Sequence, residues 1–272
     1  MDRSPTCAGV WPGLLVLLLC ATPAASVTDE SVTFSLIDPG RGLTMHKELY
    51  ALPYTHANRY HGAESEAIFQ LSAKHDLFGS RFYFAYTQIS FWQAYDTGGS
   101  SPFRDTNYNP EIFYRHPESR VGAALLGFDA GAEHESNGQR LPLSRSWNLL
   151  YVAPYYHGER WLVYFKLRYR IPEDDKTSPD DPLGDDNPDI TDYLGYSDLH
   201  LYYALPRGHL LHFLMRGYLG TSRGNVSLSY SFPFPGDMDA YLVARFFSGY
   251  GESLLDYDKS INRIGVGVMF DR

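Results

Sequence analysis

The sequence is nearly devoid of cysteine, with only Cys7 and Cys20 in 272 residues. Both lie close to the N-terminus, in a stretch that we expect to be removed from the mature chain. A disulfide framework needs an even set of cysteines, and a thiolate zinc site or a thiol enzyme needs at least one. These three classes are therefore excluded. A lipid-anchoring role for Cys20 is disfavoured, because Leu19 and not a small residue precedes it.

An excess of positive charge is also lacking. The formal net charge is -9, which argues against a nucleic-acid partner, since such proteins carry a basic face or stripe. The chain is 44% hydrophobic and 20% charged, which excludes intrinsic disorder. Aromatic residues reach 15%, an enrichment that favours strands over helices.

The N-terminal stretch has the layout of a secretory signal peptide. Arg3 is followed by an apolar run from Gly13 to Cys20 and then by small residues from Ala24 to Ser26. The run is too short to span a membrane as a helix. We therefore expect residues 1–26 to be the signal peptide and residues 27–272 to form an exported β-barrel domain.

Helical periodicity is missing from about Lys47 onward, and period-two segments take its place. In residues 160–170 one face carries Trp161, Val163 and Phe165, and the other is largely charged. Chain breakers between such segments delimit about twelve expected strands. Their ranges are 47–56, 67–77, 81–95, 109–116, 121–135, 144–157, 160–171, 192–204, 209–220, 224–234, 238–248 and 261–271.

The links between these segments nearly alternate between short and long. Short links are expected at 78–80, 117–120, 158–159, 205–208 and 235–237, and long links at 57–66, 96–108, 136–143, 172–191 and 249–260; the short link at 221–223 breaks the pattern. Tight turns at one end and long loops at the other are typical of outer-membrane barrels. The prediction is an all-β, twelve-stranded antiparallel transmembrane β-barrel in the bacterial outer membrane, with a polar lumen. The alternative is a soluble β-sandwich or lipocalin-like barrel, whose apolar face points inward.

Polar residues interrupt the expected lipid face on the fifth and sixth segments. His134 and Ser136 share parity with Leu126 and the small residues of their segment, and Asn148 shares parity with Leu150. A constant index sum across a hairpin places His134 opposite a position close to Asn148. A hydroxyl beside an imidazole that a third group orients is the arrangement of an activated serine nucleophile. The alternative is three interfacial polar residues without chemistry.

The link at 172–191 is strongly acidic. The spacing of Asp185, Asn187 and Asp189 allows calcium binding, but the glycine and distal glutamate of an EF-hand loop are missing. A solvated acidic loop is the favoured interpretation from spacing alone.

Several motifs in order resemble the outer-membrane phospholipase A family. The likeness covers about residues 67–270. The motifs that carry it are Tyr86-Thr87-Gln88, Ser100-Ser101-Pro102-Phe103-Arg104-Asp105-Thr106-Asn107-Tyr108, His134-Glu135-Ser136-Asn137-Gly138, Ser144-Arg145-Ser146-Trp147-Asn148, Asp185-Asp186-Asn187-Pro188-Asp189-Ile190-Thr191 and Ser248-Gly249-Tyr250-Gly251-Glu252-Ser253-Leu254.

The resemblance implies a calcium-dependent phospholipase A1/A2, a carboxylic ester hydrolase acting on membrane phospholipids and lysophospholipids. It implies a homodimer in the outer membrane. By match of motif, Ser136 is the nucleophile, His134 the general base and Asn148 its orienting partner. The backbone N–H of Gly138 matches an oxyanion donor.

The resemblance also implies a calcium site that two subunits share. By match, Ser144 and the main-chain carbonyl of Gln139 come from one subunit and Ser100 from the other, with Asp186 as a further ligand. Oxygen donors of this kind suit calcium. Gln139 departs from the family, whose usual residue there is basic. Gln88 matches a glutamine of the dimer interface.

Two rival functions stay open at this point. One is a non-catalytic outer-membrane channel, whose selectivity Arg160, Lys166, Arg168 and Arg170 would set. The other is a soluble exported barrel that binds a small ligand.

Overall fold

The computed structural model describes residues 32–178, 181, 184–217, 223–236 and 238–272. The expected signal peptide, residues 1–26, lies outside the described residues. In the described part of the chain no helix is long and apolar enough to cross a membrane. Its strands are β1 (Leu43–Met45), β2 (Leu49–Ala57), β3 (Glu66–Leu77), β4 (Phe82–Trp92), β5 (Phe103–Val121), β6 (Ala124–Ser136), β7 (Ser146–His157), β8 (Trp161–Arg170), β9 (Ser197–Leu205), β10 (His209–Gly217), β11 (Asn225–Pro233), β12 (Tyr241–Gly249) and β13 (Ile261–Asp271); the short helices are η1 (Gly62–Glu64), α1 (Ile190–Leu194) and η2 (Pro206–Gly208).

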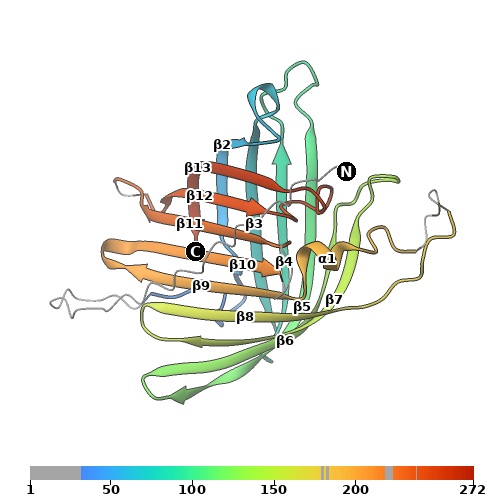
Figure 1. The fold of residues 1–272 in the computed structure, drawn as a ribbon. Helices are drawn as coiled ribbons and strands as arrows, with labels where there is room; N and C mark the ends of the chain where they lie inside the picture. Colours follow the sequence, from blue (N-terminus) through green and yellow to red (C-terminus); the bar gives the residue numbers. More distant parts are fainter. Residues whose placement is uncertain (1–31, 179–180, 182–183, 218–222, 237) are drawn as a thin grey trace, which may run out of the picture. The chain divides into compact units, whose positions relative to one another are not determined.

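The strands close into a barrel. Each strand from β2 to β13 pairs antiparallel with its neighbours in sequence, and β13 pairs with β2 (Figure 1). The three-residue β1 pairs with β3 alone, beyond the point where β2 ends its pairing. The ring formed by the described residues therefore has twelve strands, β2 to β13. This confirms the predicted twelve-stranded antiparallel barrel.

One predicted boundary was wrong, because β5 is much longer than residues 109–116. It runs from Phe103 to Val121, and the turn into β6 lies at Gly122, whose φ of 63° suits a glycine. Pro117 is a chain breaker by propensity, but it lies where the β5–β6 register shifts between His116 and Ser119. A proline, which lacks an N–H, is tolerated at such a bulge, so the strand continues.

The link between β8 and β9 also differs from the prediction. Residues 190–194 form the helix α1, and β9 begins at Ser197, not at residue 192. The helix lies at the end of the barrel opposite to the β7–β8 and β9–β10 turns (Figure 1).

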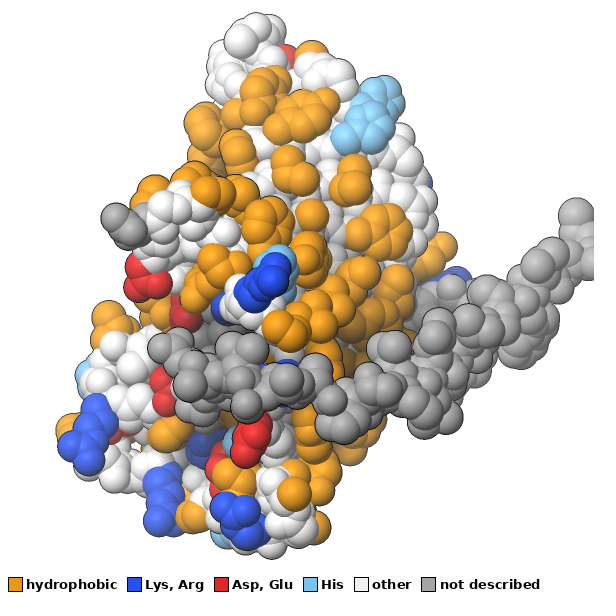
Figure 2. Space-filling model, turned by 90° about the vertical axis from the view of Figure 1, so that its left-hand side faces the viewer, with side chains coloured by type: hydrophobic (Ala, Val, Ile, Leu, Met, Phe, Trp, Pro, Cys, Tyr) orange, Lys and Arg blue, Asp and Glu red, His pale blue; other side chains and the backbone are white. Residues whose placement is uncertain are grey.

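The outer surface of the strands is apolar and the lumen is polar. Large exposed hydrophobic side chains include Leu126, Leu150 and Val152, and Figure 2 shows hydrophobic side chains over much of the face in view. Charged residues such as Asp129 and Arg168 are buried inside the barrel. This is the reverse of a soluble barrel and is the pattern of strands that face lipid.

A chain segment packs inside the lumen at the end where the tight turns lie. Residues 34–37 pack against inward-facing aromatic rings, among them Tyr83, Phe113 and Tyr155. The guanidinium of Arg115 donates from Nη2 to the Leu36 carbonyl at 2.8 Å. We call residues 34–37 the plug segment.

Apolar packing covers the long-loop end. Ile190 and Leu194 of α1 pack with Trp147 of β7 and with Leu254 and Tyr257 of the β12–β13 loop. Each end of the barrel therefore contains a cluster of buried hydrophobic side chains.

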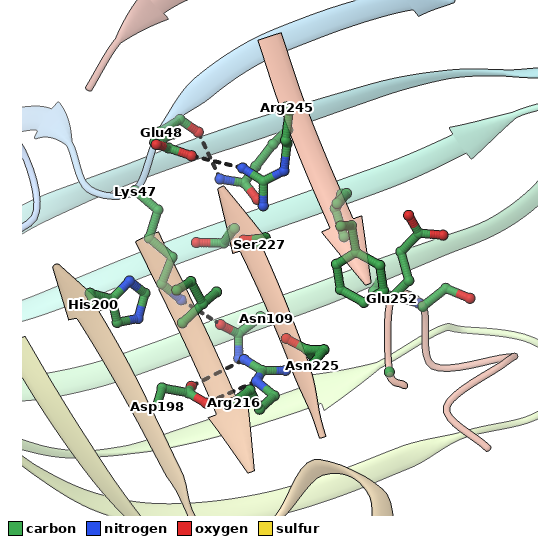
Figure 3. Close-up of a pocket in the computed structure, with 18 of the residues that line it drawn as sticks. Lys47, Glu48, Asn109, Asp198, His200, Arg216, Asn225, Ser227, Arg245 and Glu252 are labelled. Atoms are coloured by element: carbon green, nitrogen blue, oxygen red, sulfur yellow. Dashed lines mark hydrogen bonds and ion pairs between the residues drawn. The ribbon is translucent and has the colours of Figure 1, made fainter. Parts of the chain in front are cut away.

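A cavity of about 200 Å³, lined by charged and apolar side chains, lies between the two ends. Its charges pair with each other (Figure 3): Arg245 Nη1 lies 2.9 Å from Glu48 Oε2, and Arg216 Nε lies 2.9 Å from Asp198 Oδ1. Three of the cations considered for a channel also have carboxylate partners, namely Lys166 with Glu133 at 2.7 Å, Arg168 with Asp198 at 2.9 Å and Arg170 with Asp185 at 2.7 Å. These contacts disfavour the channel hypothesis, because the carboxylates compensate three of the cations that would set its selectivity.

Candidate active site

The candidate site lies on the hairpin of β6 and β7. The register of this hairpin pairs His134 with Asn148 and Ser136 with Ser146. The predicted pairing of His134 with Asn148 is therefore observed. The loop between the strands, residues 137–145, is one of the long links.

The side chains flanking His134 in sequence point into the lumen. Glu133 is 8% exposed and accepts a hydrogen bond at 2.7 Å from the ammonium group of Lys166 on β8. Glu135 accepts from the Trp147 indole at 2.8 Å. Because successive strand side chains alternate between faces, His134 and Ser136 belong to the outer face.

His134 and Asn148 are in direct contact. The distance from His134 Nδ1 to Asn148 Oδ1 is 2.8 Å. Asn148 Nδ2 also donates to Glu173 Oε1 at 3.0 Å. Sequence reasoning counted Glu173 only as part of the acidic link.

The Ser136 hydroxyl lies on the same face, two residues from His134, and both side chains are half-buried. Among the described residues it forms no hydrogen bond with the imidazole. Catalytic hydrogen bonds are often long without substrate and shorten in the complex with it. The structure thus joins two of the three expected groups and places the third beside them on the strand.

The loop after Ser136 is shaped by a buried asparagine. Asn137 is 4% exposed; its Oδ1 accepts from the Arg145 N–H at 2.9 Å, and its Nδ2 donates to the Leu143 carbonyl at 2.9 Å. These bonds hold the two ends of the loop together. Sequence reasoning gave no role to Asn137.

Gly138 adopts a conformation that other residues rarely take. Its φ is 62°, and a Cβ there would lie 3.1 Å from Cε2 of Tyr108. In the described part of the chain no acceptor contacts its N–H. A free backbone N–H donor is one of the groups that an oxyanion hole requires.

Two of the expected calcium ligands meet. The Ser144 hydroxyl donates to the carboxylate of Asp186, whose other oxygen lies 2.5 Å from Lys176 Nζ. Gln139 lies in the same loop as Ser144. Ser100 lies in the exposed loop between β4 and β5, with a φ of 65°. Hydroxyl, carboxylate and carbonyl oxygens fit a calcium ion. The described residues contain no cluster of three or more His, Cys, Asp or Glu side chains that could hold a metal by themselves.

The acidic link is held against the barrel. Both carboxylate oxygens of Asp185 accept hydrogen bonds from Arg170 Nη2 at 2.7 Å. Asn187 Oδ1 accepts from the Ser146 N–H at 3.0 Å. Asp189 accepts from the Tyr257 hydroxyl at 2.5 Å. These three side chains therefore serve three different partners. They do not form the calcium loop that their spacing allowed.

The sequence is similar to those of known phospholipases. The model of the phospholipase A1 family matches residues 41–270. A phospholipase A1 of Escherichia coli K12 is 38% identical over 191 residues, which cover 69% of this chain and 61% of that protein. The chain spans between 53% and 62% of the length of such curated relatives.

Two solved structures are similar over most of the chain. The outer membrane phospholipase A from Escherichia coli superposes with a TM-score of 0.74 at 33% identity, covering 84% of this chain and 97% of that one. The Salmonella typhi outer membrane phospholipase, crystallised as a dimer with bound calcium, gives a TM-score of 0.72 at 33% identity, covering 84% of this chain and 91% of that one.

Proposed function

This chain belongs to the phospholipase A1 family and is an outer-membrane β-barrel, and from this premise we propose that it hydrolyses acyl ester bonds of membrane phospholipids and lysophospholipids. The observation that carries the proposal is the 2.8 Å contact between His134 Nδ1 and Asn148 Oδ1 on the lipid-facing side of the barrel. An imidazole oriented by an acceptor, with a serine hydroxyl beside it, is the machinery of acyl transfer.

The proposed chemistry gives each of the three side chains a role. His134 Nε2 takes the proton of the Ser136 hydroxyl as Oγ attacks the ester carbonyl. The Gly138 N–H donates to the carbonyl oxygen as it becomes negative. His134 then returns the proton to the leaving glycerol oxygen, so that a lysophospholipid departs and an acyl-serine remains. Water, deprotonated by His134, attacks this ester, and His134 then gives the proton to Ser136 Oγ as the acyl–oxygen bond breaks and the fatty acid is released.

The location of the site on the outer face of the barrel makes it accessible to membrane lipids. Ser136 ends β6 where the long loop begins, and the neighbouring surface carries exposed Leu150 and Val152. Long loops of such barrels lie outside the cell, so the site faces the outer leaflet. Acyl chains of a lipid can reach it laterally, without entering the lumen.

We further propose a calcium site that a homodimer completes. Ser144, Asp186 and the Gln139 carbonyl would hold the ion on one subunit, and Ser100 would reach it from the other. Calcium, when bound, supplies positive charge close to the developing oxyanion. The proposed interface includes Gln88, which accepts from the Tyr86 hydroxyl at 2.9 Å. It lies on the outer face of β4, which also carries exposed Phe82 and Phe84.

Removal of calcium is the experiment that tests the metal assignment. Phospholipid hydrolysis in detergent should fall to background with a chelator and recover on addition of calcium. Ser144→Ala should need a roughly tenfold or higher calcium concentration, because loss of one group at a metal site weakens binding by about that factor. Ser80→Ala, in the β3–β4 turn, is the control and should keep the parental calcium requirement. Undiminished hydrolysis in chelator would remove the calcium site while leaving the serine mechanism in place.

A further inference from the structure

A carboxylate that the serine mechanism does not use touches the candidate triad. Asn148 Nδ2 donates to Glu173 Oε1 at 3.0 Å, while Asn148 Oδ1 lies 2.8 Å from the imidazole of His134. The three side chains thus form a continuous chain of hydrogen bonds. It begins in the acidic link that follows β8 and ends at the ring that would activate Ser136.

The local backbone holds Glu173 in this position. The N–H of Ile171 donates to the Asn148 carbonyl at 2.8 Å, so the end of β8 is held beside Asn148. Pro172 follows and restricts Ile171 to extended backbone. Ile171 and Glu173 therefore share parity, and Glu173 lies half-buried over the outer face of β7.

Resting on the proposed function, we propose that Glu173 is a positioning residue that fixes the orientation of the Asn148 amide and thereby the tautomer of His134. An ionised carboxylate only accepts hydrogen bonds, so the Asn148 NH₂ group must face Glu173 and Oδ1 must face the ring. An amide oxygen also only accepts, so His134 Nδ1 must carry the proton. This leaves the lone pair on Nε2, the nitrogen that takes the proton of the Ser136 hydroxyl.

Glu173 also supplies a charge that a triad with an amide lacks. When His134 is protonated during attack, Asn148 presents only a dipole to it. The carboxylate of Glu173 lies one hydrogen bond further along the same line and polarises the amide toward the ring. The protonated imidazole is thus stabilised while no ionised group touches it.

No other carboxylate takes this place among the described residues. Glu133 and Glu135, beside His134 on β6, face the lumen with their own partners. From β5, the nearest contact is the Asn109 amide, which donates to the His134 carbonyl at 3.0 Å. From β7, the Asn148 side chain contacts the imidazole of His134. From β8, the Ile171 N–H contacts the Asn148 carbonyl.

The test is Glu173→Gln, which keeps the size of the side chain and removes its charge. We expect kcat to fall roughly tenfold to a hundredfold with KM little changed, since hydrogen bonds to charged groups carry effects of this size. The acid limb of the pH–rate profile should move to lower pH, because a protonated ring loses a favourable charge. The calcium concentration for half-maximal activity should stay at the parental value.

Asp174→Asn is the matched control, because Asp174 is the next residue and is an exposed carboxylate of the same link. It should leave kcat and the pH profile unchanged. Adding Glu173→Gln to Asn148→Ala should cause no further loss, since the effect passes through Asn148. A further loss in that background, or a Glu173→Gln protein as active as Asp174→Asn, would overturn the proposal. These outcomes are distinct from failure of the serine mechanism, which Ser136→Ala tests alone.

Discussion

A Ser136→Ala protein should lose phospholipid hydrolysis by roughly 10⁴- to 10⁶-fold, the scale of removing a serine nucleophile from other hydrolases. The reason is that Oγ forms the acyl intermediate, and neither His134 nor Asn148 can replace that bond. Residual hydrolysis would come from the Gly138 N–H and from substrate binding. The measurement is release of fatty acid from mixed micelles with calcium present.

The hydroxyl directly across the hairpin provides the control. Ser146 pairs with Ser136 in the β6–β7 register and is also half-buried. Ser146→Ala removes the same group from the opposite strand and should retain activity within a few fold of the parent. Should Ser136→Ala hydrolyse phospholipid as fast as the parent, the serine mechanism would be wrong, and a barrel without this chemistry would be the better reading.

Much of the fold was predictable because side chains alternate between the two faces of a strand, which leaves only two ways to assign them to lipid and lumen. Once lipid requires apolar side chains on one face, the positions of Leu126 and Leu150 determine which way each strand faces. The same parity places His134 on the outer face and, with the index sum of the hairpin, opposite Asn148. These steps need only local sequence and the geometry of antiparallel strands.

Other features depend on contacts that local sequence does not report. Pro117 is a breaker by propensity, yet a bulge lets β5 continue through it. α1 is only five residues long, too short for periodicity to reveal, and its Ile190 is buried by packing over the barrel end. Glu173 was one acidic residue among many, and only the fold of the link shows that it touches Asn148. The roles of Gly138 and Ser144 came from the resemblance and not from spacing.

A large loss of stability is expected when the buried ion pair between Asp129 and Arg115 inside the barrel is broken. Asp129 is 0% exposed and binds Arg115 through two contacts, Nε at 2.8 Å and Nη2 at 2.7 Å. The guanidinium lies among the rings of Tyr83, Phe113 and Tyr155, at 5.4 to 5.7 Å from their centroids. The Asp129 carboxylate therefore compensates the positive charge of Arg115 among these rings.

Asp129→Ala should therefore lower the free energy of unfolding by about 3–5 kcal/mol, the cost of leaving one member of a buried ion pair uncompensated. Urea unfolding in detergent would measure it. Glu159→Ala, in the exposed β7–β8 turn, removes the same charge at the surface and should change stability by less than about 0.5 kcal/mol.

The decisive comparison is the double variant Asp129→Ala with Arg115→Met. It removes both charges together, and buried pairs replaced by apolar groups are often neutral or stabilising. The double variant should therefore be more stable than Asp129→Ala alone. Some loss should remain, because Arg115 also donates to the Leu36 carbonyl of the plug segment at 2.8 Å. A double variant no more stable than Asp129→Ala would mean that the cost lies in lost packing at this end of the lumen and not in the unpaired guanidinium.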